Sequence, residues 1–364
     1  MRVLMTGHRG FIGSVMAPML MERGHEVVGL DTDWFARCTF QGEVPEIETI
    51  YEDLRDVNLS SFDGFDAVIH LAGLSNDPMG DLNPALTDDI NYRATMRIAE
   101  LAKQAGVHRF LFSSSCSTYG AAGDDLLDET AEFNAVTAYG KSKVDSEIAL
   151  AKLADDEFSP TYMRSATAYG LSPRIRFDLV VNNLTAWAFT TGKVMLKSDG
   201  TPWRPIVHIG DISRAFIAAL EAPREVIHNE AFNVGRSDEN YRIRELAEFV
   251  TEIVPGSELA FAKGAGPDKR CYRVDFTKIE TRLPGFKPIW TVKRGIRELY
   301  DAYRESDLML EDFEGWRFHR LAHLKYLMEC NLIGDDLRYR DHASRTDVPD
   351  GVADKEPVFA GSEA

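Results

Sequence analysis

The chain has 364 residues, of which 44% are hydrophobic and 27% are charged, so it can bury one large core or two moderate ones. Asp and Glu number 58 against 41 Lys and Arg, and the resulting formal net charge of −17 disfavours nucleic acid and anionic lipid as partners. The four cysteines form no CxxC pair and no apolar run is long enough to span a membrane, so we expect a cytoplasmic protein with reduced thiols, no metal and no membrane contact.

Short apolar runs alternate with amphipathic stretches over the first two-thirds of the chain. Because parallel neighbours in a sheet need crossover connections, this alternation predicts an α/β fold with a doubly wound parallel sheet, the Rossmann arrangement. The predicted elements are, in chain order, a strand at 2–5, a helix at 13–23, strands at 26–30 and 67–71, a helix at 90–105 and a strand at 109–113.

The pattern becomes less regular after about residue 170, and strand signals return at 205–207 and 231–234. We therefore expect a first domain at 1–170 that also receives segments near 205–235, and a smaller interleaved C-terminal region at 171–335 that binds substrate. Residues 336–364 are charged, Asp-rich and without apolar periodicity, which predicts a disordered acidic tail. An acidic interaction segment is the alternative for this tail.

Three glycines with regular spacing, Gly7, Gly10 and Gly13, follow the first predicted strand and open the first predicted helix. Such a turn lets the backbone approach a pyrophosphate and lets the helix pack on the sheet, while the helix N-terminus favours negative charge. The first domain is therefore predicted to bind a dinucleotide, with Phe11 and Ile12 in the same turn. A tight strand-to-helix turn without a ligand is the alternative.

Asp31, at the end of the second predicted strand, favours NAD over NADP, because its carboxylate accepts hydrogen bonds from the ribose hydroxyls and repels a 2′-phosphate. Arg9 points the other way, since the His8-Arg9 pair resembles the turn of some NADP-using GDP-fucose synthases; otherwise it is a solvated loop charge. Asp31 would lie nearer to the disputed hydroxyl, so NAD is predicted. Asp53 and Leu54 are candidate adenine contacts, with an acidic helix N-terminus as the alternative.

Tyr139 and Lys143 lie four residues apart, so a helix would place them on one face. A neighbouring ammonium lowers the pKa of a phenol, so Tyr139 could act as acid and base near neutral pH, and Lys143 could also reach the nicotinamide ribose. An ordinary surface pair is the alternative. Upstream, the serine-rich stretch 113–120 ends a predicted strand at the carboxyl edge of the sheet, where doubly wound folds bind ligands; a polar turn is the alternative there.

The chain contains five motifs in the order TGHRGFIG, HLAG at 70–73, SSSCSTYG, YGKSK and RPIVHIGDI. In these motifs it resembles the extended short-chain dehydrogenases/reductases, the nucleotide-sugar epimerase/dehydratase family, over roughly residues 1–300. The resemblance implies that Tyr139 and Lys143 are catalytic and that Ser115 hydrogen-bonds the reacting sugar oxygen. Asn91 matches a residue that supports the active site. The residues assigned to NAD are Gly7, Arg9, Gly10, Phe11, Ile12, Gly13, Asp31, Asp53, Leu54, Leu71, Ala72, Gly73, Asn91, Tyr139 and Lys143.

The resemblance also implies a nucleotide-diphosphate sugar as the substrate. Thr167 stands where family members often have Asn. Asn183 and Arg204 match residues that bind the substrate phosphates, and an arginine suits this role because it forms charge-assisted hydrogen bonds to phosphate. A surface polar residue is the alternative at each position. Arg174, Arg176 and Trp187 could suit a charged or elongated sugar, or simply pack and face solvent. The residues assigned to the substrate are Ser75, Ser115, Thr167, Asn183, Arg204, Asp268 and Arg270.

The two residues that directly follow Ser115 indicate which reaction of the family this chain could catalyse. Family 4,6-dehydratases carry Asp-Glu there, whereas this chain has Cys116 and Ser117, which are poor substitutes for an acid/base pair. Epimerisation, most readily at C4, needs no further acid, because Tyr139 can take the sugar hydroxyl proton as hydride leaves the carbon and can give it back when hydride returns. A nucleotide-sugar dehydrogenase or 4-keto reductase is the alternative, and a non-catalytic dinucleotide-binding protein on the same fold is a more distant one.

The resemblance finally implies a homodimer in which two helices from each subunit pair, around residues 90–105 and 140–154. These stretches carry the apolar residues Ile98, Leu101, Ile148 and Leu150, which could serve such an interface. The alternative is that the same residues face their own sheet.

Overall fold

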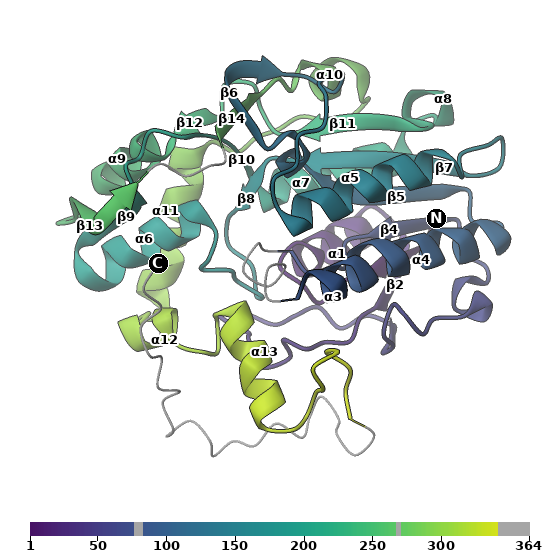
Figure 1. Cartoon of the computed structure of the whole chain (residues 1–364), viewed down its shortest axis with the longest axis horizontal. Helices are drawn as coiled ribbons and strands as arrows, with labels where there is room; N and C mark the ends of the chain where they lie inside the picture. The colour runs from purple at the N-terminus through teal and green to yellow at the C-terminus, as the bar shows by residue number, and fades with distance from the viewer. Residues whose placement is uncertain (76–82, 267–270, 341–364) are drawn as a thin grey trace.

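The computed structural model describes residues 1–75, 83–266 and 271–340. It consists of a larger part built on a parallel sheet and a smaller part built from helices and short sheets, which lie side by side in Figure 1. Among the described helices, none is long and apolar enough to cross a membrane.

Within the described residues, seven parallel strands form the large sheet, in the order β11-β7-β5-β4-β1-β2-β3. The strands are apolar because helices cover both faces, so alternate residues enter different cores: Val3 packs on one side of the sheet and Leu4 on the other. The doubly wound sheet predicted from the sequence is confirmed. The strands are β1 (Arg2–Thr6), β2 (Glu26–Leu30), β3 (Thr49–Ile50), β4 (Ala67–His70), β5 (Arg109–Ser115), β7 (Ser159–Ser165) and β11 (Glu230–Val234).

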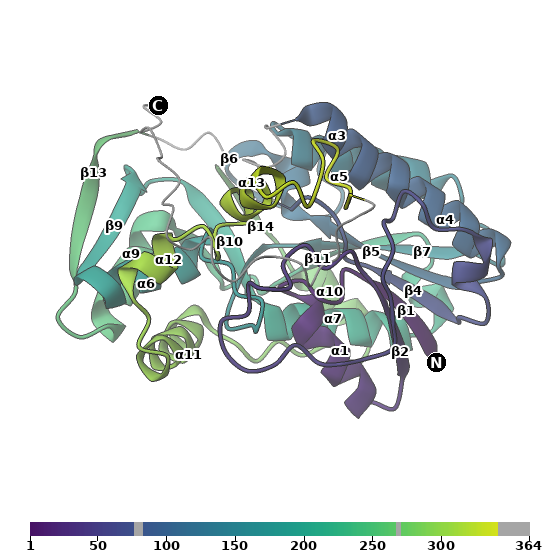
Figure 2. The ribbon, with the colours of Figure 1, turned by 90° about the horizontal axis from the view of Figure 1, so that it is seen from below.

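Two layers of helices enclose this sheet. On one side α1 (Gly13–Glu22) and α7 (Ile209–Glu221) bury apolar residues against it, and on the other side α4 (Ala94–Gln104) and α5 (Ala138–Ala151) do so. Figure 2 shows the strands between the two layers. Short elements complete this part of the chain: η1 (Leu59–Phe62), α3 (Pro84–Asp88), the π-turn η2 (Asp89–Arg93) that leads into α4, η3 (Cys116–Tyr119), α8 (Arg224–Ile227) and α10 (Thr277–Arg282).

The smaller part has its own apolar core, formed mainly by three helices, α6 (Val180–Thr191), α9 (Ile243–Ile253) and α11 (Val292–Glu305). The strand signal near 205–207 belongs to a three-stranded sheet of this part, in the order β12-β10-β8, whereas the signal near 231–234 is β11 of the large sheet. The remaining strands are β6 (Ala121–Leu127), β8 (Thr167–Tyr169), β9 (Lys193–Ser198), β10 (Trp203–His208), β12 (Asn240–Arg242), β13 (Glu258–Gly266) and β14 (Cys271–Val274), in which β9 pairs with β13 and β6 with β14.

After α11 the chain crosses back toward the large sheet through α12 (Leu310–Glu314) and α13 (Arg320–Glu329). Residues 336–340, which the sequence placed in a disordered tail, pack there: Leu337 is buried with Leu327 in a cluster that includes Leu74 and Ile90 of the larger part. The predicted tail therefore begins too early, because isolated apolar residues within the charged stretch find a partner surface only in the fold. Residues 341–364 lie outside the described chain.

The helices expected to form a dimer interface use most of their apolar residues internally. Ile98 of α4 and Leu150 of α5 are fully buried in the core beneath their own sheet, and Leu101 packs partly against the same core. Ile148 differs, since 47% of it is exposed. The alternative that these residues face their own sheet is thus correct for Ile98 and Leu150.

Candidate active site

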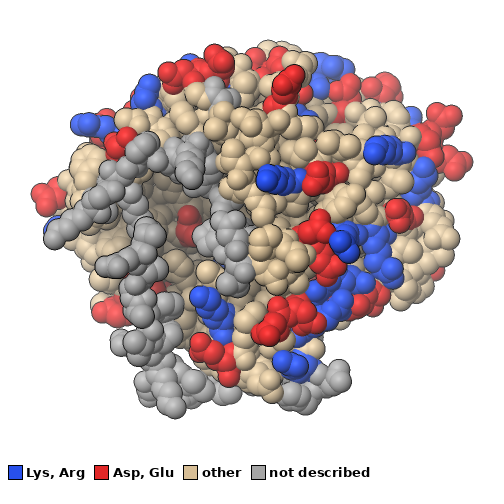
Figure 3. All heavy atoms as spheres, viewed as in Figure 1, with Lys and Arg blue, Asp and Glu red and all other residues tan. Residues whose placement is uncertain are grey.

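A cavity of about 980 Å³ lies at the carboxyl ends of the large sheet's strands, and both parts of the molecule line it. Its position is the one at which doubly wound sheets bind ligands. On the face shown in Figure 3, Lys and Arg side chains are interspersed with Asp and Glu. Among the residues described there, this mixed surface has no excess of positive charge that would attract a phosphate. Phosphates would therefore be held by individual groups inside the cavity and by helix N-termini.

The glycine turn fits a dinucleotide. Gly7 has φ +73°, and a Cβ there would lie 2.8 Å from the backbone nitrogen of Ala72; a Cβ on Gly13 would lie 2.4 Å from the carbonyl oxygen of Gly7. Any larger residue would therefore push the turn away from the sheet or from α1. Gly10, Phe11 and Ile12 also line the cavity, so the positive end of α1 is open to it.

Asp31 lies at the end of β2 and lines the cavity, where its carboxylate accepts hydrogen bonds from the backbone N–H groups of Arg9 (3.0 Å) and Asp33 (2.8 Å). Burial raises the pKa of Asp31, and those two N–H groups oppose the rise. The Arg9 guanidinium, although it lines the cavity, donates to the Asp33 carboxylate at 2.6 Å. The charge that could have favoured NADP is thus already paired, whereas the Asp31 carboxylate lines the cavity.

Most of the other residues predicted to bind the cofactor line the cavity. Leu54, Leu71, Ala72 and Gly73 line the cavity, as does Asp53, whose carboxylate is held by the Arg55 guanidinium at 2.6 Å.

Asn91 does not line the cavity. It is buried, and its side-chain amide donates to the carbonyl of Leu74 (2.9 Å) and accepts from the N–H of Leu74 (2.7 Å). Its role as a direct cofactor contact is therefore corrected: Asn91 acts as a support that holds the loop after β4.

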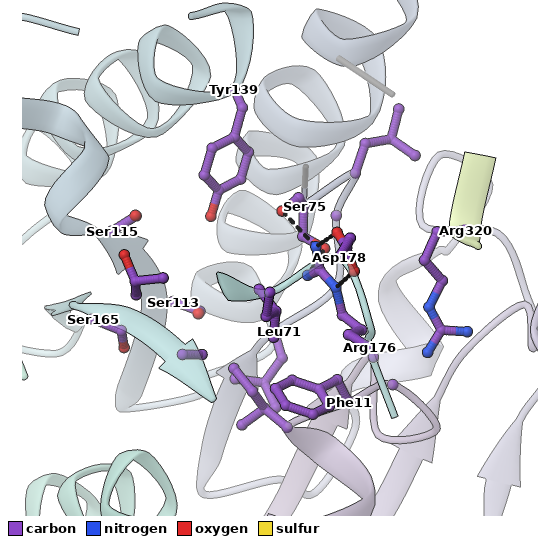
Figure 4. A pocket seen from close by; sticks show the side chains of 18 of the residues that line it. Phe11, Leu71, Ser75, Ser113, Ser115, Tyr139, Ser165, Arg176, Asp178 and Arg320 are labelled. Carbon is purple, nitrogen blue, oxygen red and sulfur yellow. Dashed lines mark hydrogen bonds and ion pairs between the residues drawn. The ribbon is translucent and has the colours of Figure 1, made fainter. Parts of the chain in front are cut away.

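The catalytic candidates meet at the cavity. Thr137 caps α5 by accepting from the Gly140 N–H (3.1 Å), so Tyr139 lies in the first turn and Lys143 one turn later. Figure 4 shows the hydroxyl groups of Tyr139 and Ser115 directed into the same space. Ser115 accepts from the N–H of Ser117 at 3.1 Å, so its own hydrogen can be donated to a ligand.

Lys143 is only 5% exposed, and its Nζ lies 5.6 Å from the centre of the Tyr139 ring. Burial lowers the pKa of Lys143 to about 8, and the Glu147 carboxylate opposes that effect. The ammonium therefore persists at neutral pH beside the tyrosine, and its burial strengthens its field there.

The two residues that follow Ser115 point in different directions. Cys116 is fully buried and its Sγ donates to the carbonyl of Arg164 at 3.1 Å, while burial raises the thiol pKa well above its usual value. Ser117 lines the cavity, and its Oγ is buried without a hydrogen-bond partner among the described residues. The cavity thus lacks a carboxylic acid at either of these two positions.

The substrate half of the cavity contains four of the predicted residues, Ser75, Thr167, Asn183 and Arg204. The Asn183 side-chain N–H donates to the Phe177 carbonyl at 2.9 Å, which fixes the amide at the wall. Two further predicted substrate residues, Asp268 and Arg270, lie outside the described residues.

The three residues left open by the sequence have separate roles. Arg174 is buried and pairs with Asp33 at 3.2 Å, and Trp187 packs edge-on against Phe313. Arg176 alone lines the cavity, where it pairs with Asp178 (2.6 Å) and donates to the Ser75 hydroxyl (2.9 Å). Figure 4 shows this group between Tyr139 and Arg320.

Sequence reasoning missed several lining residues. Ser165 ends β7 and is paired with Ser115 at the end of β5. Four further lining residues belong to no local motif and come from later segments that fold back: Ser198, Tyr272, His319 and Arg320. Among the side chains described, no group of three or more His, Cys, Asp or Glu could hold a metal ion.

Comparison with known proteins agrees with this site. Residues 3–235 match the model of the NAD dependent epimerase/dehydratase family. The chain is 28% identical to the UDP-glucose 4-epimerase of Bacillus subtilis over 334 residues, which cover 84% of this chain and 96% of that protein. It is 26% identical to UDP-glucuronic acid decarboxylase 1 of Arabidopsis thaliana over 331 residues, covering 86% of this chain and 72% of that protein.

Among solved structures, MoeE5 in complex with UDP-glucuronic acid and NAD superimposes with a TM-score of 0.74 at 26% identity, covering 84% of this chain and all of that one. The family model spans well over half of the chain. The glycine turn, Asp31, Ser115, Tyr139 and Lys143 all line the same cavity. This chain is therefore a member of the NAD-dependent epimerase/dehydratase family.

Proposed function

We propose that this enzyme epimerises a nucleotide-diphosphate sugar at C4 through a transient keto-sugar, with Tyr139 as the acid/base. The observation that carries the proposal is the meeting of Ser115, Tyr139 and Lys143 at the cavity while Cys116 is turned into the core. Oxidation at C4 needs the first three groups, whereas elimination of water from the sugar would need an acid where Cys116 and Ser117 stand. The UDP-glucose 4-epimerase relative supports a UDP-sugar as the first substrate to test.

NAD, when bound, accepts a hydride from the sugar carbon and returns it. The residues of the chain manage the proton and hold the substrate. Lys143 stabilises the phenolate of Tyr139, which takes the proton of the C4 hydroxyl and gives it back after the sugar has turned over. Ser115 hydrogen-bonds the same oxygen, and Arg204 and Asn183 hold the diphosphate.

Net oxidation or reduction of the sugar is the second candidate. The similarity to a UDP-glucuronic acid decarboxylase supports considering reactions other than epimerisation, because that relative is named for a different reaction. The two candidates differ in whether the nicotinamide is left changed after each turnover.

The test uses purified enzyme, a panel of UDP-, dTDP-, GDP- and CDP-linked sugars, and NAD at a small fraction of the sugar concentration. We expect the 4-epimer to accumulate over many turnovers per NAD, with a deuterium label at C4 retained in the product. Deuterium appearing at the inverted carbon from heavy water would instead indicate proton abstraction beside a ketone. Stoichiometric NADH formation would establish the dehydrogenase alternative.

We further propose that the enzyme is a cytoplasmic homodimer that pairs α4 and α5 of each subunit. The family resemblance supports the pairing, and the exposed Ile148 supplies an apolar contact on α5.

A further inference from the structure

The last described segment, residues 316–340, packs against the cofactor half of the molecule and is called the C-terminal segment here. Arg317 donates to the carbonyls of Arg37 (2.8 Å) and Thr39 (2.9 Å), and His323 donates to the carbonyl of Trp34 at 3.0 Å. These partners belong to the loop that follows β2 and Asp31. The C-terminal segment therefore forms a wall of the cavity at its cofactor end.

Arg320, the first residue of α13, projects from this segment into the cavity (Figure 4). The side chain is only 5% exposed. Its Nη2 donates to the carbonyls of Arg174 (2.9 Å) and Ile175 (3.4 Å), and its guanidinium lies 4.1 Å from the centre of the Phe35 ring. Its Nη1 is buried and has no hydrogen-bond partner among the residues that the structure describes. One donor group of this cavity-lining side chain is thus buried without an acceptor in the described part of the chain.

Within the described residues Arg320 forms no ion pair, although the Asp178 carboxylate is near enough to raise its pKa. The neighbouring carboxylates are engaged elsewhere, since Asp33 pairs with Arg174 at 3.2 Å and Asp178 with Arg176 at 2.6 Å. Burial lowers the pKa of Arg320 to about 10, so the guanidinium is still cationic at neutral pH. A buried cation without a counter-ion is unfavourable, and an anionic ligand would remove that penalty.

The position of Arg320 indicates which anionic ligand it would bind. Its acceptor residue Arg174 contacts Asp33, whose N–H donates to Asp31, so a short chain of contacts joins Arg320 to the ribose end of the cofactor site. Gly10 of the glycine turn lines the same cavity. We propose that Arg320 binds the pyrophosphate of NAD, so that the C-terminal segment completes the cofactor site. The proposal holds whichever sugar reaction the enzyme catalyses.

The start of α13 strengthens this assignment. Because the helix begins at Arg320, the positive end of its dipole also lies at the cavity. The pyrophosphate would thus lie between the N-termini of α1 and α13, with a guanidinium beside it. Charge-assisted hydrogen bonds of this kind are among the strong ones in proteins.

The test measures ligand affinity of the cofactor-free enzyme by calorimetry, with NAD, ADP, adenosine and UDP. Arg320→Met should weaken NAD and ADP about 10- to 100-fold, the range for a lost hydrogen bond to a charged group, and leave adenosine and UDP within about twofold. Lys325→Met is the matched control, because Lys325 is an exposed cation on the same helix and does not line the cavity. All four ligands should bind this control within about twofold of the wild type.

Arg320→Gln provides a second variant, since an amide can still donate to the carbonyl of Arg174 while lacking the charge. It should show the same selective loss of NAD and ADP, and Arg320→Lys should recover part of the affinity. Equal losses for adenosine and ADP would mean that Arg320 only shapes the pocket, and a loss confined to UDP would assign it to the substrate phosphates. Either result, or unchanged NAD binding, overturns the proposal.

Discussion

At the scale of single residues, the site depends on side chains whose surroundings set their chemistry. Tyr139 and Lys143 are held one helical turn apart by a capped helix, and Lys143 is buried beside the ring of Phe112, 4.7 Å away. Asp31 is held by two backbone N–H groups. These contacts orient the groups before any ligand arrives, which is how an active site gains most of its electrostatic effect.

Tyr139→Phe should keep the ring's packing and delete the group that exchanges the proton. We expect turnover to fall by roughly 10²-fold or more, the usual size of a positioned acid/base contribution, with NAD binding and the unfolding midpoint retained. Steady-state kinetics on the substrate found by screening, together with an NAD titration, measure both effects. Near-normal turnover in this variant would show that Tyr139 is not the acid/base.

Lys143→Met should slow the reaction and move the pH–rate profile to higher pH, because Tyr139 loses the neighbouring ammonium that favours its phenolate. In the wild type, Lys143 titrates near pH 8, so that help declines above this value. Ser115→Ala is the comparison: it should lower the rate by less and leave the profile in place, since it removes a hydrogen bond but no charge. A Lys143→Met profile that coincides with the wild type would contradict the assigned role.

Asp31 should make the enzyme bind NAD at least tenfold more tightly than NADP, a difference of about 1.4 kcal/mol. The carboxylate repels a 2′-phosphate, and Arg9 is occupied by Asp33. Calorimetric titration with both cofactors measures the ratio, and Asp31→Asn should reduce it. Equal or tighter binding of NADP by the wild type would reverse the assignment and return Arg9 to consideration.

At the scale of secondary-structure elements, buried carboxylates hold the start of α11 against the small sheet. Glu239 accepts from the N–H of Val292 at 2.8 Å and from the Tyr241 hydroxyl at 3.2 Å, while Asp211 accepts from the N–H groups of Ile289 and Trp290. These contacts satisfy the open amides at the start of the helix and fix it relative to β10 and β12.

Glu239→Gln should raise the free energy of unfolding more at pH 8 than at pH 5. Burial raises the pKa of Glu239 to about 7, against 4.5 in the unfolded chain, and the Val292 N–H opposes the rise. Between these values the folded state holds a proton that the unfolded state lacks, so wild-type stability falls as pH rises through this window. Glutamine does not ionise and still accepts from Val292, so the gain at pH 8 should be on the order of 1–3 kcal/mol.

Urea unfolding at both pH values measures this difference. Glu248→Gln serves as the control, since Glu248 is exposed and pairs only with Arg244 on the helix surface; its effect should be small and similar at both pH values. A Glu239→Gln variant that is less stable than the wild type at pH 8 would show that the charged carboxylate is the better cap.

The proposed homodimer is tested at this scale. Light scattering at micromolar concentration should give twice the chain mass, and Ile148→Glu should shift the enzyme toward the monomer by placing a charge in the α4–α5 interface. Met309→Glu is the matched control, because Met309 is 58% exposed just before α12 and lies outside the proposed interface. A monomer mass for the wild type would remove the dimer proposal.

At the scale of the whole molecule, one cavity draws its walls from three stretches of chain that are far apart in the sequence. The large sheet supplies Gly7, Asp31 and Ser115, the smaller part supplies Arg204, and the C-terminal segment supplies Arg320. Cofactor binding and substrate binding therefore both depend on how the parts pack together.

The sequence by itself was enough to predict the fold class, the glycine turn between the first strand and helix, the position of Asp31 after the second strand, and the one-turn spacing of Tyr139 and Lys143. Each is a local pattern whose meaning depends on neighbours within a few residues: a period of two or 3.6, a glycine where a side chain would clash, or two groups one helical turn apart. The strand at 26–30 was predicted with the bounds that the structure has. Local hydrogen bonding and side-chain alternation are enough to specify such features.

Only the tertiary structure decided the contacts of Asn91, Cys116, Arg174 and Arg320, and the packing of residues 336–340. Cys116 and Ser117 are adjacent in sequence, yet one faces the core and the other the cavity. Arg320 meets Phe35 and Arg174 across intervals of the chain that no periodicity spans. Burial, ion pairing and the direction of a side chain arise from contacts between distant segments, and these exist only once the whole chain has packed.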